Sequence, residues 1–155
     1  MKIGILNFHR ALNYGAVLQC YGLQETLTAL GHEVSVIDYR PRIIEKHRSY
    51  FLFDILKEKG IIPFIRSTIY SLLTLPNKYK CKKAFDDFLS KYLKLTDFVV
   101  SLLDLAKLDS FDIIFVGSDQ VWSERITGLD NVYLGNFVKY HVRYIAYAAS
   151  LGASV

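Results

Sequence analysis

The chain has 155 residues, of which 52% are hydrophobic, 14% aromatic and 22% charged, and only three are prolines. This composition is typical of a globular domain and excludes a disordered or collagen-like chain. No apolar run reaches the ~18 residues of a membrane-spanning helix, because Arg66 interrupts the best candidate. The first residues lack the charged and apolar regions of a signal peptide, so we expect none.

The cysteines and histidines predict neither a disulfide nor a metal site. Cys20 and Cys81 are far apart in a chain with no export signal, which favours two free thiols. The four histidines are scattered, and none stands at a metal-ligand spacing from a cysteine. We therefore expect a cytoplasmic protein without a bound metal or resident cofactor.

The net charge of +4 is unevenly distributed along the chain. Residues 40–83 contain eleven Lys or Arg and three Asp or Glu, a local charge of +8, and the remaining residues carry −4. A basic segment binds an anionic membrane surface, a phosphorylated substrate or nucleic acid, or it forms a solvated helical face. The solvated face is the simpler interpretation, and nucleic acid is the weakest because no binding module for it is recognisable.

The first forty residues predict a strand, a helix and a second strand. Residues 2–8 form a short apolar run that suits a strand buried on both faces. Apolar residues then recur at spacings of four, three, four and three, which predicts one face of a helix: Ala16, Cys20, Leu23, Leu27 and Leu30. Gly31 stands where a left-handed cap ends such a helix, and residues 33–39 form the next strand. The segment is a βαβ unit, in which the helix connects two parallel strands.

Residues 40–95 predict a largely helical insertion. One helix begins at residues 61–63, with Pro63 in its first turn, and Pro76 ends it. A second helix then presents an apolar face made of Cys81, Phe85, Phe88 and Tyr92. After it we expect a short strand over residues 96–100 and a short helix over residues 102–108.

Two further strands follow, over residues 111–116 and 142–148. Strands that alternate with helices predict an α/β fold, here one Rossmann-like domain with an open, mostly parallel sheet and helices on both faces. In such sheets ligands bind beyond the carboxyl ends of the strands, and two loops of this sequence lie there.

The first loop, residues 9–16, joins the first strand to the first helix. Gly15 permits close approach of a ligand, and the following helix offers free N–H groups to a phosphate or carboxylate. A single glycine, with no Gly-Lys-Ser/Thr after it, excludes both the dinucleotide fingerprint and the P-loop. The alternative is that Asn13 caps the helix and Gly15 serves the turn, and spacing alone does not choose between the two.

The second loop, residues 117–122, follows the most hydrophobic strand. Gly117 allows a sharp turn, and three polar residues then offer donors and acceptors to sugar hydroxyls. Trp122, the only tryptophan, suits the apolar face of a pyranose, and Asp119 suits removal of a proton from an attacking hydroxyl. The alternative is that Asp119 caps a turn and Trp122 fills the core, which is the commoner role of a lone tryptophan.

Other candidates depend on position alone. Asp38 stands at the end of a strand, like a ribose-binding acid. Arg40, Arg42 and Arg48 suit an anionic substrate, although surface solvation is the default for such residues. Ser118 lacks a histidine placed by sequence to activate it as a nucleophile.

Together the two loops resemble motifs of the polysaccharide pyruvyl transferase family. Residues 13–19 (Asn-Tyr-Gly-Ala-Val-Leu-Gln) resemble its opening motif, and residues 117–122 (Gly-Ser-Asp-Gln-Val-Trp) resemble its second. Residues 144–152 are similar to the strand that follows, and residues 133–137 lie where the family has an aromatic-rich strand. The order and spacing of the motifs extend the resemblance over almost the whole chain, although residues 40–95 contribute little to it.

The resemblance implies one half of a GT-B-like two-domain architecture, in which residues 1–155 form the N-terminal, acceptor-side domain. It also implies exopolysaccharide biosynthesis, with transfer of a pyruvate ketal from phosphoenolpyruvate to a surface glycan. Asp119 becomes the catalytic candidate. The candidate substrate-binding residues are Asn13, Tyr14, Gly15, Gln19, Gly117, Ser118, Gln120 and Trp122.

The family's arginine and histidine residues that hold phosphoenolpyruvate belong to a second domain, which the resemblance places after Val155. We therefore expect the isolated chain to be inactive. The expected partners are a glycan or lipid-linked sugar acceptor, the C-terminal domain and a second copy of the chain, and no nucleic acid. The expected location is the cytoplasm, and the basic segment leaves contact with the inner face of the membrane open.

Two other functions stay open on the sequence. The first is half of a nucleotide-sugar glycosyltransferase, which predicts specific binding of a nucleotide. The second is a non-catalytic module that binds a glycan or takes part in assembly, which predicts no turnover of phosphoenolpyruvate in any context.

Overall fold

A computed structural model describes residues 1–40, 61–97, 99, 104, 111–123, 130–138 and 141–152. Within these ranges it describes the side chains of all residues except 61–74, 118 and 119. Arg42, Arg48 and most of the short helix expected over residues 102–108 lie outside the described residues.

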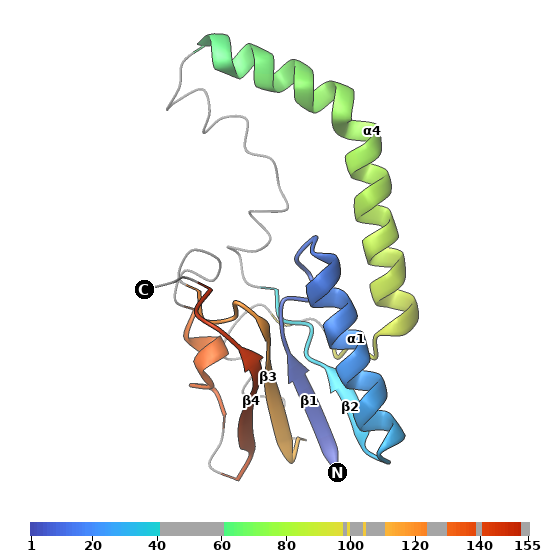
Figure 1. The fold of residues 1–155 in the computed structure, drawn as a ribbon, viewed down its shortest axis with the longest axis vertical. Coiled ribbons are helices and arrows are strands. Elements are labelled where there is room, and N and C mark those ends of the chain that lie inside the picture. Colours follow the sequence, from blue (N-terminus) through green and yellow to red (C-terminus); the bar gives the residue numbers. More distant parts are fainter. Residues whose placement is uncertain are drawn as a thin grey trace.

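The described strands form one parallel sheet with the order β2-β1-β3-β4 (Figure 1). They are β1 (Lys2–Leu6), β2 (Glu33–Val36), β3 (Ile113–Asp119) and β4 (Arg143–Ala149). All of them run in the same direction, so their carboxyl ends lie at one edge of the sheet, which we call the carboxyl rim. This arrangement confirms the open, parallel α/β sheet predicted from the sequence.

The order of the strands reverses between β1 and β3. The chain passes from β1 to β2 on one side, returns to the other side of β1 for β3, and then continues outward to β4. Right-handed connections that move in opposite directions lie on opposite faces of a sheet. Accordingly α1 (Tyr14–Ala29) packs on one face and the short 3-10 helix η1 (Asn131–Leu134) on the other.

Helix α1 begins and ends where its sequence predicts. The side chain of Asn13 accepts hydrogen bonds from the backbone N–H groups of Gly15 and Ala16, which caps the first turn. At the other end Gly31 has a φ of +86°, a conformation that favours glycine and terminates the helix. Cys20 lies on the buried face of α1 and is 1% exposed.

Helix α4 (Ile61–Tyr92) is one continuous helix, and the expectation that Pro76 ends a first helix is wrong. A proline inside a helix removes one backbone hydrogen bond, and the turns on both sides of Pro76 continue without it. In Figure 1, α4 lies beside α1 and extends past the carboxyl rim. Its described contacts with α1 come from the C-terminal half, where Phe85 and Leu89 are buried.

The short strand expected over residues 96–100 is also absent from the described structure. In its place two isolated parallel bridges join Val36 to Leu95 and Tyr39 to Val99. Thr96 donates its backbone N–H to the carbonyl of Val36, so the segment follows the edge of β2 without forming a regular ladder.

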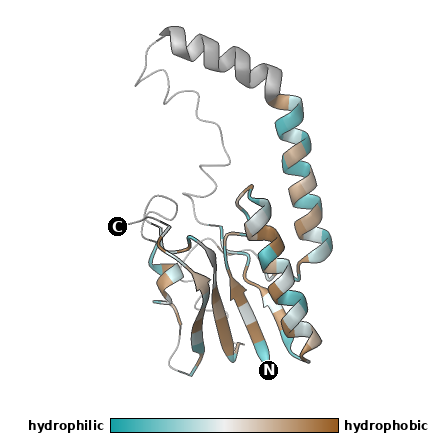
Figure 2. Cartoon of the chain, in the orientation of Figure 1, coloured by the Kyte–Doolittle hydropathy of each residue, from teal (hydrophilic) through white to brown (hydrophobic). Residues whose placement is uncertain are grey.

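The core lies on both faces of the sheet, because alternate strand residues point to opposite sides. Ile3 and Ile5 of β1 pack with α1 and α4, whereas Leu6 packs with Val116 on the face covered by η1. Figure 2 shows the resulting apolar colouring along the strands. Burying each aliphatic side chain of this size stabilises the fold by about 1.5–3 kcal/mol relative to leaving it exposed.

The β4 side of the sheet is less covered than the β1 side. Ile145 and Tyr147, which alternate with the residues that face η1, are 37% and 47% exposed. Among the described helices, none has the length and apolar character needed to cross a membrane.

Candidate functional site

The two loops singled out in the sequence leave the sheet at the same place. β1 and β3 are hydrogen-bonded neighbours with parallel direction, so both loops start from the carboxyl rim at the point where the strand order reverses. Ala11 of the first loop and Trp122 of the second pack against the same buried cluster. The prediction that the loops share one rim is therefore confirmed, and the point where the strand order reverses is where open α/β sheets bind ligands.

The first loop is held from below by two buried polar side chains at the end of β1. Asn7 is 2% exposed and His9 has no exposed surface. The Oδ1 atom of Asn7 accepts the backbone N–H of His9 at 3.1 Å and lies 3.0 Å from its Nδ1. The amide nitrogen of Asn7 donates to the carbonyl of Ala16 in α1, so this pair ties β1 to the following helix.

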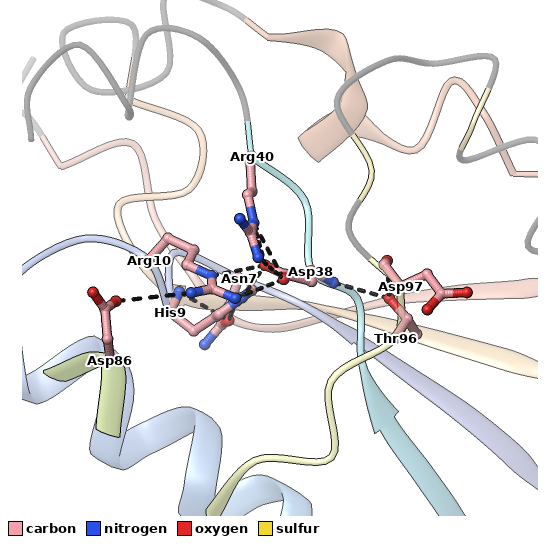
Figure 3. Close-up of polar contacts among 8 residues, drawn as sticks. All are labelled: Asn7, His9, Arg10, Asp38, Arg40, Asp86, Thr96 and Asp97. Carbon is pink, nitrogen blue, oxygen red and sulfur yellow. Dashed lines mark hydrogen bonds and ion pairs between the residues drawn. The ribbon is translucent and has the colours of Figure 1, made fainter. Parts of the chain in front are cut away.

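Asp38, just beyond β2, is the centre of a charged cluster (Figure 3). Its carboxylate accepts two hydrogen bonds from Arg10, at 2.8 and 2.6 Å, and its shortest bond from Arg40 is also 2.6 Å. The Nε2 atom of His9 lies 3.2 Å from Oδ1 of Asp38. Arg10 also approaches Asp86 of α4 at 3.9 Å, so the cluster joins β1, β2 and α4.

Burial and hydrogen bonding have opposite effects on the pKa values of Asp38 and His9. Burial alone would raise the pKa of Asp38, but the hydrogen bonds from His9, Arg10 and Arg40 outweigh it and hold the pKa well below its usual range. Complete burial lowers the pKa of His9, and the neighbouring Asp38 carboxylate offsets part of that effect. Asp38 is therefore ionised, and the guanidinium groups of Arg10 and Arg40 are both hydrogen-bonded to its carboxylate.

The sequence does not predict this cluster, since it points to Asp38 only by its position at a strand end. His9 and Arg10 lie about thirty positions from Asp38 in sequence, and they meet it because β1 and β2 are adjacent and parallel. The signal that could have found them is topological: polar residues directly after neighbouring parallel strands face one another at the rim.

The candidate residues of the first loop lie on the first turns of α1. Asn13 and Tyr14 are exposed, and Gln19 is half-buried farther along the helix. The capping role of Asn13, one of the two interpretations left open, is confirmed. Gly15 lies within α1, and a Cβ there would come within 3.3 Å of the Oδ1 atom of Asn13. A role for these residues in substrate binding stays a prediction.

Gly117 does not form the sharp turn that the sequence suggests. β3 continues through it to Asp119, and the backbone of Asp119 still pairs with Ala149 of β4. A Cβ at Gly117 would overlap the carbonyl oxygen of Tyr147. Glycine is required there by the close approach of β4, since any side chain would collide with its backbone.

The remainder of the second loop is fastened to the segment that follows β4. The backbone N–H of Trp122 donates to the carbonyl of Ser150 at 3.2 Å. Gly152 has a φ of +71°, and a Cβ there would overlap the side chain of Gln120. The Gln120 side chain therefore lies against the Gly152 backbone. The side chains of Ser118 and Asp119 lie outside the described residues.

Trp122 is half-buried, and its indole is anchored. Its Nε1–H donates to the carbonyl of Tyr133 at 2.9 Å, and the ring packs against the cluster beneath η1. This contact agrees with the interpretation of Trp122 as part of the core, and it fixes the orientation of whatever ring surface remains accessible.

Residues 133–137 do not form the aromatic-rich strand that the resemblance implies. Their N-terminal part belongs to η1, which Gly135 ends with a φ of +81°. Tyr133 is buried, with its ring centroid 5.0 Å from that of Phe8 and 5.8 Å from that of Tyr39. The aromatic residues are thus used to pack the rim from the η1 face.

Comparison with known families decides where the chain belongs. The model of the family described as polysaccharide pyruvyl transferase matches residues 13–154. The chain belongs to the polysaccharide pyruvyl transferase family. No curated protein and no solved structure matches it individually. The matched range begins at Asn13, so it includes the second loop and residues 13–16 of the first, whereas His9 and Arg10 precede it.

Proposed function

We propose that the chain contributes the acceptor side of a pyruvyl transferase, which adds a pyruvate ketal from phosphoenolpyruvate to two hydroxyls of a sugar in a surface glycan. The observation that carries the proposal is the position of residues 13–19 and 117–122. These segments follow neighbouring parallel strands at one rim of the sheet, within a chain that the family model covers almost completely. The proposal includes a second, GT-B-like domain that completes the active site.

The reaction has definite requirements. Protonation of the methylene carbon of phosphoenolpyruvate makes C2 electrophilic, and one sugar hydroxyl forms a C–O bond to it. A second hydroxyl then forms another C–O bond at C2, and the bond to the phosphate oxygen breaks. One of the two hydroxyl protons balances the new methyl group, and the other leaves with inorganic phosphate. The site therefore needs a proton acceptor, hydroxyl-binding groups and cations for the donor.

The second loop suits the acceptor part of this chemistry. We assign Asp119 to take the proton from the attacking hydroxyl, because it ends β3 at the carboxyl rim. Trp122 offers a held ring surface to the sugar. The residues that we place around the sugar hydroxyls or close to the sugar are Asn13, Tyr14, Gly15, Gln19, Gly117, Ser118 and Gln120.

The donor part needs cations from elsewhere. Arg10 and Arg40 lie at this rim, but both bind the Asp38 carboxylate. We infer that the phosphate and carboxylate of phosphoenolpyruvate are held by groups outside the two loops. The chain is then expected to bind an acceptor sugar in the absence of phosphoenolpyruvate, and to release no phosphate from the donor by itself.

Saturation-transfer NMR with pyranosides and the purified chain tests the proposal. We expect signal transfer to a pyranoside with free vicinal or 4,6-hydroxyls, and at least a tenfold weaker affinity in Asp119→Asn. Glu33→Gln, which makes the same carboxylate-to-amide change at an exposed site on the opposite edge of the sheet, is the matched control. Equal affinities in all three proteins would refute the acceptor role. Specific binding of a nucleotide sugar would favour the glycosyltransferase alternative.

A further inference from the structure

An apolar groove lies between α1 and α4, next to the carboxyl rim. It has a volume of about 240 Å³, and its lining is almost entirely apolar. The residues that line it are Tyr14, Val17, Leu18, Ala84, Phe85 and Phe88. A hollow of this volume is smaller than the roughly 300–1,000 Å³ of most small-molecule sites. It has room for part of an aliphatic chain and offers almost no polar surface to a polar ligand.

The edges of the groove carry large apolar side chains that face solvent. Tyr14 is 70% exposed and Leu18 is 56% exposed, although both also line the groove. Exposed leucine and tyrosine beside an apolar groove are typical of surfaces that insert into the boundary between lipid headgroups and acyl chains.

The charge on α4 complements an anionic surface. Residues 75–94 contain six lysines and two aspartates, a net charge of +4. One of the two aspartates, Asp86, is approached by Arg10, which reduces its effect on the lysines. This stretch includes residues 75–83 of the basic segment recognised in the sequence.

Two of these lysines lie on the side of α4 that lines the groove. Lys80, Ala84, Phe88 and Lys91 follow one another at spacings of four, four and three, so they form one stripe along the helix. Both lysines are exposed. The Nζ atom of Lys91 lies 5.2 Å from the centre of the Tyr92 ring. The groove side of α4 therefore carries two lysines, with one carboxylate, that of Asp87, between them on the same stripe.

We propose that α1 and α4 form a docking surface for an anionic lipid bilayer. The groove takes the end of one acyl chain, and Lys80 and Lys91 contact the lipid phosphates. Tyr14 and Leu18 enter the headgroup region beside them. A protein partner would leave the excess positive charge uncompensated unless it were acidic, whereas an anionic bilayer supplies both the aliphatic chain and the phosphates. The proposal does not depend on the function proposed above.

Vesicle sedimentation with the full chain tests the proposal. We expect binding to vesicles of phosphatidylcholine with phosphatidylglycerol, much weaker binding to phosphatidylcholine alone, and loss of binding as the salt concentration rises. Each lysine near an anionic surface contributes a factor of roughly five to the affinity, so Lys80→Gln with Lys91→Gln should weaken binding roughly 25-fold. Lys2→Gln with Arg143→Gln, two exposed cations at the opposite edge of the sheet, should change it by less than about twofold, because they lie far from the docking surface.

The apolar contribution has its own pair of variants. Leu18→Glu should abolish binding, whereas Leu30→Glu, at the exposed far end of α1, should leave it unchanged. In Leu18→Trp the indole emission should shift to shorter wavelength when anionic vesicles are added. Equal binding to both kinds of vesicle, or no binding to either, would overturn the proposal. A self-association that Leu18→Glu abolishes, without vesicle binding, would assign the groove to a second copy of the chain instead.

Discussion

The two halves of the carboxyl rim are held in different ways. Beyond β1 and β2, the loops are fixed by side chains: one buried carboxylate receives two arginines and a histidine. Beyond β3 and β4, close packing depends on two glycines: Gly117 lies against the backbone of Tyr147, and the backbone of Gly152 lies against the Gln120 side chain. A rim held by side-chain charges uses those side chains for structure. The other half, which we call the backbone-packed half, depends on glycines at positions where a side chain would collide with a neighbouring segment.

The largest effect should come from the backbone-packed half. Gly117→Ala places a methyl group where the carbonyl oxygen of Tyr147 lies, so β3 and β4 must separate or the domain must unfold. We expect a loss of more than about 4 kcal/mol in the free energy of unfolding, at the extreme of single substitutions. Urea unfolding measures it, with Gly22→Ala as the control, since a Cβ at this helical position meets nothing within 4 Å. A stable Gly117→Ala variant would show that the strand spacing adapts.

The charged half should lose somewhat less. Asp38→Asn keeps the shape of the side chain but leaves Arg10 and Arg40 without their carboxylate. Breaking a buried ion pair at one partner costs about 3–5 kcal/mol, and partial exposure of Arg40 should place this variant at the lower end. Thermal or urea unfolding measures the change. A loss below about 1 kcal/mol would mean that the cluster is solvated and does not anchor the loops.

The same cluster predicts how stability depends on pH. The pKa of His9 is lowered by folding, so the unfolded chain binds the extra proton and stability falls as the pH drops below about 6.5. The pKa of Asp38 is also lowered, so its contribution is fully present above about pH 4 and is lost as the pH falls further. Unfolding curves across this range should show both stages, and His9→Gln should lack the first. A slope between about pH 7 and 5 that is unchanged in that variant would contradict the assignment.

The smallest loss of stability should come from the N-cap of α1. Asn13→Ala removes the acceptor for the N–H groups of Gly15 and Ala16 and should cost about 1 kcal/mol. Asn13→Asp retains an acceptor and should recover most of this stability. If Asn13 also binds the sugar, Asn13→Asp will keep the stability yet lower the affinity for the pyranoside, which separates the two roles.

Periodicity and end signals in the sequence are enough to predict the sheet and α1. The spacing of Ala16 to Leu27 and the later glycine determine that helix locally, and the structure agrees. Leu30, expected on the same apolar face, is instead the C-cap and is 67% exposed. Pro76 is misleading because a proline disfavours only the turn in which it lies, and the helical turns on both sides of it continue. Gly117 resembles a turn residue in the sequence. Glycine is needed there because the carbonyl of Tyr147 approaches it closely, and that residue lies on another strand.

The candidate site is predictable to the extent that it depends on topology. Both loops can be located at one rim because parallel strands place their carboxyl ends together. The partners of Asp38 cannot be found in this way, because hydrogen bonds between side chains leave no periodic trace in a single sequence. The order of the strands would reduce the search to residues that directly follow β1 and β2, which include His9 and Arg10.

The buried thiol of Cys20 makes it possible to measure how often α1 separates from the sheet. Burial raises the pKa of Cys20 to about 12, which reduces its thiolate at neutral pH roughly a thousandfold relative to an exposed thiol. Alkylation of Cys20 should therefore occur only when α1 lifts from the sheet, whereas the half-buried Cys81 is open to reagent in the native state. After Cys81 has reacted, the rate at which a thiol reagent modifies Cys20 would report the opening equilibrium of the βαβ unit without any added label.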